Sequence, residues 1–174
     1  PLPRSLTALL IKENKKALAS AVLKSGNPVE GEKIFRRREL ACFSCHAIGS
    51  VGSHIGPNLV AAGAAAQTDY IIEAILEPNK TIAQHYENRL ITLADGTIRM
   101  GAITYKGEKS IMIRDSAQAG REIRIATDTI RKIKPMPSLM PAGLIDQLQT
   151  RQEFLDLARF VSLLGRPGPY ANNE

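Results

Sequence analysis

The sequence predicts a mainly α fold that carries a small antiparallel β insertion, so that the chain is α+β overall. Apolar residues recur at helical spacing near both ends of the 174-residue chain. Short runs of alternating apolar and polar residues fill the stretch between Tyr86 and Ile133. Hydrophobic residues make up 44% of the chain, which is enough to build a globular core.

The predicted helices lie on both sides of the β-rich stretch. Pro28 suits the first turn of the second helix, and Thr68 or Asp69 is expected to cap the third. Gly165 and Pro167 follow the last apolar repeat and are expected to end the fourth helix. The four predicted helices span residues 6–24, 29–40, 68–76 and 144–164.

The β insertion is expected to consist of four or five short strands. Its runs are NRLITLADG, TIRMGAITYKG, KSIMIRD, REIRIATD and TIRKI. Asp95-Gly96 and Lys106-Gly107 lie between runs and are typical of hairpin turns. So many short strands in under fifty residues predict a small antiparallel sheet or barrel.

The charge of the chain bears on its partners. The formal net charge is +6, but the basic residues are scattered, and Arg36-Arg37-Arg38 has no interleaved aromatics. We therefore expect no nucleic-acid binding, and either a solvated face or a docking face for an acidic redox partner.

No apolar run approaches the roughly 20 residues of a membrane span. Residues 1–4 lack the layout of a signal peptide, which predicts a mature or excised form.

The only two cysteines lie in the run Cys42-Phe43-Ser44-Cys45-His46. A Cys-x-x-Cys-His run is the attachment signature of c-type haem. Two thiols three residues apart can each form a thioether to one haem vinyl group, and the adjacent histidine can bind the iron. The motif therefore predicts one covalently attached haem c.

Three other interpretations of the cysteines are weaker. A thioredoxin-like pair is expected in a βαβ context, whereas this motif follows a predicted helix and precedes a glycine-rich loop. A structural zinc site needs further ligands, and the chain has no other cysteine. A plain disulfide or two buried thiols is the simplest alternative.

The second axial ligand of the iron has several candidates. Met140 is the preferred one, because it precedes Pro141 in a loop that several prolines stiffen, just before the last predicted helix. Met136 and His85 are the alternatives to Met140. The other candidates are His54, which is too close to the motif, and Met100 and Met112, which lie in predicted strands.

The order of these features resembles the class I cytochromes c. They are a helix, the Cys-x-x-Cys-His motif, a Gly-Pro-Asn-Leu stretch, a Met-Pro loop and a terminal helix. The resemblance implies that the carbonyl of Pro57 orients His46, and that Asn58 and Leu59 lie near the haem. It also implies that the first and last helices of that fold cross through Gly31, Phe35 and Phe160.

More narrowly, the chain is similar to the haem-binding domain at the C-termini of large secreted proteins of planctomycetes and verrucomicrobia. The stretches that match are GEKIF, CFSCH, GPNL, DYIIEAILEPNK, the β segment and SLMPAGL, across about residues 28–165. The expected organisation is an N-terminal helix or linker (1–27), a proximal half (28–85), the β insertion (86–134), and a distal loop with terminal helix and tail (135–174).

The function that these features predict is electron transfer by a domain that is not itself an enzyme. With His46 and Met140 on the iron, a redox partner protein or an upstream dehydrogenase-like domain would supply the electron. The alternative is a haem sensor or small-ligand-binding module with a displaceable distal ligand. The resemblance implies a periplasmic or other extracytoplasmic location. The oligomeric state is open, and a dimer is possible.

Overall fold

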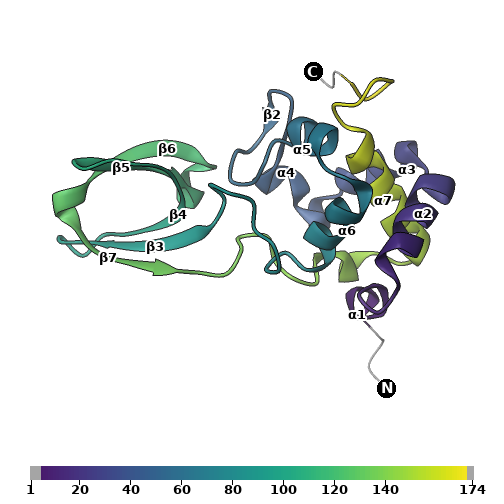
Figure 1. The fold of residues 1–174 in the computed structure, drawn as a ribbon, viewed down its shortest axis with the longest axis horizontal. Coiled ribbons are helices and arrows are strands. Elements are labelled where there is room, and N and C mark those ends of the chain that lie inside the picture. Colours follow the sequence, from purple (N-terminus) through teal and green to yellow (C-terminus); the bar gives the residue numbers. More distant parts are fainter. Residues whose placement is uncertain (1–4, 172–174) are drawn as a thin grey trace.

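A computed structural model describes residues 5–171 of the chain, which form two units joined side by side (Figure 1). The helical unit comprises residues 5–87 and 136–171, and the β unit comprises residues 88–135. Residues 1–4, on which the expectation of a mature or excised form rests, and residues 172–174 of the tail lie outside the described residues. The helices are α1 (Leu6–Leu10), α2 (Lys15–Ser25), α3 (Pro28–Phe35), α4 (Cys42–Cys45), α5 (Leu59–Ala65), α6 (Thr68–Leu76) and α7 (Arg151–Leu163), with four short 3-10 helices η1 (Arg38–Leu40), η2 (Ser116–Gln118), η3 (Thr127–Thr129) and η4 (Leu144–Gln147).

The prediction of a mainly α fold with a small β insertion is wrong. Helices make up 42% and strands 22% of the structure, which has a five-stranded antiparallel sheet and a separate two-stranded one. The physical reason is that the β unit has a hydrophobic core of its own, built on Ile91, Ile111, Ile113 and Ile125. The chain therefore has a substantial α+β fold.

The five-stranded sheet curls around this core, as the strands on the left of Figure 1 show. The strand order is β6-β5-β4-β3-β7, and every neighbouring pair is antiparallel. A turn at Gly96, with φ of +88°, joins β3 to β4, as the Asp95-Gly96 pair predicts. The strands are β3 (Asn88–Leu93), β4 (Ile98–Lys106), β5 (Ser110–Asp115), β6 (Arg121–Ala126) and β7 (Ile130–Pro135), and the small hairpin of the helical unit is β1 (Ala47–Ile48) with β2 (Val51–Gly52).

The helical unit is organised around the crossing of α3 and α7. A Cβ atom at Gly31 would lie 2.0 Å from the carbonyl oxygen of Asp156 and 2.8 Å from the Cβ of Phe160, so only glycine allows this approach. The rings of Phe35 and Phe160 pack with centroids 5.6 Å apart. The crossing expected from Gly31, Phe35 and Phe160 is therefore present.

Several predicted helices are shorter than expected because local caps interrupt them. The segment 6–24 is two helices, since the Asn14 side chain accepts a hydrogen bond from Ala17 N and starts α2. The segment 144–164 is a 3-10 turn and then α7, which begins at a capping box of Thr150 and Glu153.

Two other helix boundaries also differ from the prediction. The helix expected over 29–40 starts at Pro28 and ends at Phe35, and a 3-10 turn follows it. The N-cap of α6 is Gln67 rather than Thr68 or Asp69, and its side chain makes no capping hydrogen bond. Within residues 5–171, none of the helices has both the length and the apolar character needed to cross a membrane.

Candidate haem site

The Cys-x-x-Cys run forms a single helical turn, α4. Ala41 precedes it with a left-handed φ of +51°, and the His46 N–H donates to the Cys42 carbonyl at 2.9 Å. Residues three apart lie on the same face of a helical turn, so Cys42 and Cys45 are neighbours. The Phe43 ring packs edge-on against Phe35, with centroids 4.9 Å apart, and this contact anchors the turn to the α3–α7 crossing.

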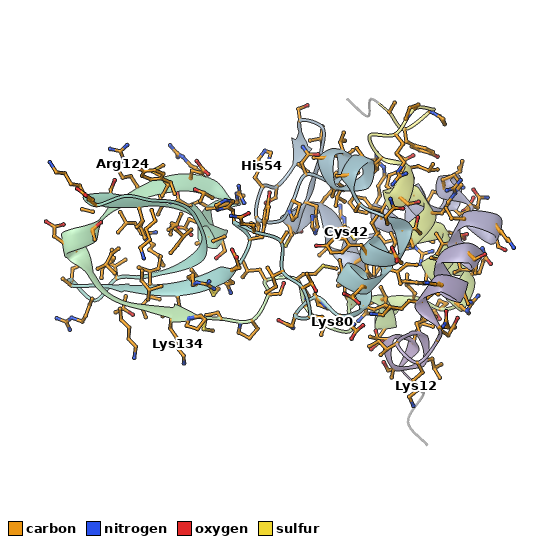
Figure 2. All side chains as sticks on the ribbon, in the orientation of Figure 1. Lys12, Cys42, His54, Lys80, Arg124 and Lys134 are labelled. Carbon is orange, nitrogen blue, oxygen red and sulfur yellow. The ribbon has the colours of Figure 1, made fainter. Side chains whose placement is uncertain are left out.

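Both cysteines are free, half-buried thiols. Burial raises the pKa of the Cys42 thiol to about 11 and also raises the pKa of Cys45. Both groups are therefore protonated at neutral pH, whereas a thioredoxin-like pair depends on a thiolate. Figure 2 shows Cys42 among the helices, on the side of the helical unit that faces away from the N-terminal helices.

The imidazole of His46 is held in one orientation. Its Nδ1 atom lies 2.8 Å from the carbonyl oxygen of Pro57, which can only accept a hydrogen bond. Nδ1 therefore carries the proton, and Nε2 has the free lone pair that a metal requires. Burial lowers the pKa of His46 despite the opposing effect of the hydrogen bond to Pro57, so the neutral, metal-binding form is favoured.

The chain beside His46 is shaped to fit the ring. A Cβ atom at Gly56 would lie 2.6 Å from Cε1 of His46, and the Gly56 N–H donates to the Cys45 carbonyl at 2.7 Å. Only a glycine therefore leaves room for the imidazole at this position.

The two residues after Pro57 are tied into the helical unit. The Asn58 side chain donates to the Gly49 carbonyl at 2.7 Å and accepts from Val60 N, so it joins the β1–β2 turn to the start of α5. Leu59 is buried in the hydrophobic core of the helical unit.

The candidates for the distal ligand lie in different surroundings. Met140 is half-buried in the loop between β7 and η4, where its N–H donates to Ser138 Oγ at 3.2 Å. Met136 lies in the same loop, and its N–H donates to the Asn88 carbonyl at 3.0 Å. His85 is exposed and has a φ of +64°. The remaining candidates are Met100 in β4, Met112 in β5, and His54 in the loop that faces the β unit (Figure 2).

The donor set fits a covalently attached haem. Two protonated thiols lie on one helical turn, the next residue offers Nε2 of a neutral imidazole, and thioethers are available in the 136–140 loop. Residues 5–171 contain no group of three or more His, Cys, Asp and Glu side chains that could hold a metal ion. A haem iron takes four of its ligands from the porphyrin and does not need such a group.

Basic and aromatic residues surround one side of the motif. A cavity of about 280 Å³ opens beside Cys42. The Arg36 guanidinium lies 5.3 Å from the centre of the Phe43 ring and also pairs with Glu32. Arg37 pairs with Glu153 of α7. The residues that line the cavity are Phe35, Arg36, Arg37, Arg38, Ala41, Cys42, Phe43 and Ser44.

Two polar residues that hold the 136–140 loop are not apparent from the sequence. Asn88 and Asn79 hold this loop through bonds between residues 49 and 59 positions apart, which no local pattern reveals. The contact of Ser138 with Met140 is local, and a serine two residues before a backbone N–H is a recognisable turn signal. The chain matches no protein-family model and no curated protein.

Proposed function

We propose that the chain is an electron-transfer protein that carries one covalently attached haem c. Cys42 and Cys45 would each hold the haem through a thioether: the S–H of each thiol would add across one vinyl group, with sulfur on one carbon and hydrogen on the other, so no oxidant would be consumed. His46 would hold the iron through Nε2, and Met140 would hold it through its sulfur. The observation that supports this most is the Nδ1 contact of His46 with Pro57, which leaves Nε2 free to act as a ligand.

When bound, the haem supplies a one-electron couple. Pro57 keeps His46 in one tautomer and increases the basicity of Nε2. A methionine sulfur favours ferrous iron and so raises the reduction potential relative to two histidines. With His46 and Met140 both holding the iron, an electron could enter and leave without a change of ligands.

The partner is a redox protein or a linked dehydrogenase-like domain, in an extracytoplasmic compartment. The net charge of +6, and the arginines that line the cavity beside Cys42, support an acidic surface on that partner. A docking surface next to the motif would bring the partner's cofactor close to the haem edge.

The axial assignment is tested by spectra of wild type, Met140→Ala and Met136→Ala, each produced with a c-type maturation system. We expect wild type and Met136→Ala to show the far-red absorption band of methionine bound to ferric iron, and Met140→Ala to lack it. If Met140→Ala keeps the band, the distal ligand is not Met140. If wild-type spectra shift readily with carbon monoxide, the distal ligand is displaceable and the sensor function is favoured.

A further inference from the structure

The β unit contacts the helical unit at two loops that matter for the proposed site. The proximal loop, residues 53–57, ends at Pro57, the hydrogen-bond partner of His46. The distal loop, residues 136–140, follows β7 directly and ends at Met140. Both loops lie where the two units meet in Figure 1.

The distal loop is held from both sides. From the β unit, the Asn88 side chain donates through Nδ2 to the Pro137 carbonyl at 3.0 Å, and the Asn88 carbonyl accepts from Met136 N at 3.0 Å. From the helical unit, the Asn79 side chain accepts from Ser138 N at 2.8 Å. Prolines restrict the internal conformation of the loop but do not fix its position relative to the rest of the protein, so these hydrogen bonds must do so.

The proximal loop is attached to the turn between β5 and β6, at the same end of the sheet as Asn88 but two strands away from β3. The Ala119 carbonyl, in the turn between β5 and β6, accepts from Ser53 Oγ at 3.0 Å and from His54 N at 3.2 Å. Gly120 has a φ of +79°, and a Cβ atom there would lie 2.2 Å from the carbonyl carbon of His54. The backbones of the two units are therefore in direct contact, and Ser53 is buried between them.

Asn88 is an unusual residue for the start of a strand. It is 3% exposed, and no described residue donates to its Oδ1 atom. A buried amide with an unpaired oxygen costs free energy that an apolar side chain would not. The Nδ2 atom of Asn88 donates to the Pro137 carbonyl, and this hydrogen bond gives a physical reason for an asparagine at this position.

We propose that the β unit is a brace that holds the proximal and distal loops at a fixed separation, with Asn88 as the positioning residue for Met140. The proposal rests on the function proposed above, because Met140 matters only if it binds iron. Ala119 and Gly120 contact the proximal loop, which leads to Pro57. Asn88 contacts the distal loop, which leads to Met140. The rigid sheet between them links the surroundings of the two axial ligands.

The first test does not depend on haem. Hydrogen exchange of the backbone amides of residues 136–140 is compared between wild type, Asn88→Ala and Ile113→Val. Loss of one hydrogen bond is expected to speed exchange in this loop roughly threefold to tenfold in Asn88→Ala. Ile113→Val, which loosens the β core without touching the loop, is expected to leave it unchanged. Unchanged exchange in Asn88→Ala, or an equal rise in Ile113→Val, overturns the assignment of Asn88 as the residue that holds this loop.

The second test uses the haem-loaded protein and reads the far-red methionine band and the reduction potential. In Asn88→Ala the equilibrium for methionine ligation is expected to fall by the same factor as the exchange protection, whereas Ile113→Val and Arg124→Ala keep the wild-type band. Protected amides at residues 111–113 confirm that the variant is folded. Faster exchange with an unchanged band and potential shows that Asn88 holds the loop but does not position Met140. A wild type without covalent haem contradicts the proposed function instead. The hydrogen-exchange result still tests whether Asn88 of the β unit holds the distal loop.

Discussion

The Nδ1 atom of His46 lies 2.8 Å from the carbonyl oxygen of Pro57, and this contact fixes which nitrogen of the ring is free. The carbonyl cannot donate, so the proton lies on Nδ1 and the lone pair on Nε2. The contact depends on Gly56, which leaves the space that the ring occupies.

Gly56→Ala is therefore expected to displace His46. The new Cβ would lie 2.6 Å from Cε1, so the ring must move away from Pro57. Loss of the hydrogen-bond partner of a metal-binding histidine lowers metal affinity by about 10–100-fold. We expect a strong decrease in covalent haem per chain, measured by absorbance after denaturation.

Gly96→Ala is the control for this variant. It introduces the same methyl group at a φ of +88° in the β3–β4 turn, where nothing lies within 4 Å. It is expected to lower the melting temperature while leaving the haem content unchanged. Equal haem content in the two variants would show that the fit around His46 is not needed.

Gly31→Ala is expected to destabilise the helical unit by about 1–3 kcal/mol or more, because its Cβ would overlap the backbone of Asp156. The free energy of unfolding in urea measures this. Val29→Ala on the same helix, at a side chain that is 55% exposed, is expected to change it by less than about 0.5 kcal/mol. A similar small effect of both substitutions would mean that α3 and α7 can separate without cost.

Stability between pH 7 and pH 3 is expected to depend on an ion cluster that joins α2 to α6. Lys15 and Lys80 both pair with Glu73 and Glu77. The hydrogen bond from Lys15, followed by the contribution of Lys80, lowers the pKa of Glu73. A depressed carboxyl pKa stabilises the folded state above the ordinary glutamate value of about 4.3, and this stabilisation is lost as the pH falls below it.

The measurement is the free energy of unfolding as a function of pH for wild type and two lysine variants. Lys15→Met is expected to flatten the loss of stability on acidification. Lys12→Met removes an exposed charge that forms no ion pair with any of residues 5–171, and it should leave the slope as in wild type. If Lys15→Met and wild type have the same slope, the cluster does not contribute.

The strands and their turns were predictable from the sequence because alternation and Asp-Gly or Lys-Gly pairs act locally. The helix boundaries were not, since a cap such as Asn14 competes with a continuing apolar repeat. The predicted fold class is wrong because alternation places residues such as Ile91 and Ile113 in strands but does not reveal the separate core that they build together.

In the candidate site, too, local features are predictable from the sequence and long-range contacts are not. The spacing of Cys42, Cys45 and His46 predicts the attachment motif, and the resemblance implies the contact of Pro57 with His46, which is present. The contact of Asn88 with Pro137 joins residues 49 positions apart, and only the folded chain reveals it.

Covalent attachment of haem to Cys42 and Cys45 is the central claim, and the intact mass of the denatured protein tests it most directly. After production with a c-type maturation system and acid–acetone extraction, we expect wild type to retain the mass of one haem. The Cys42→Ala, Cys45→Ala double variant should then have the mass of the bare polypeptide. A wild type that loses its haem on extraction, or that never gains one and has two titratable thiols, would contradict the claim.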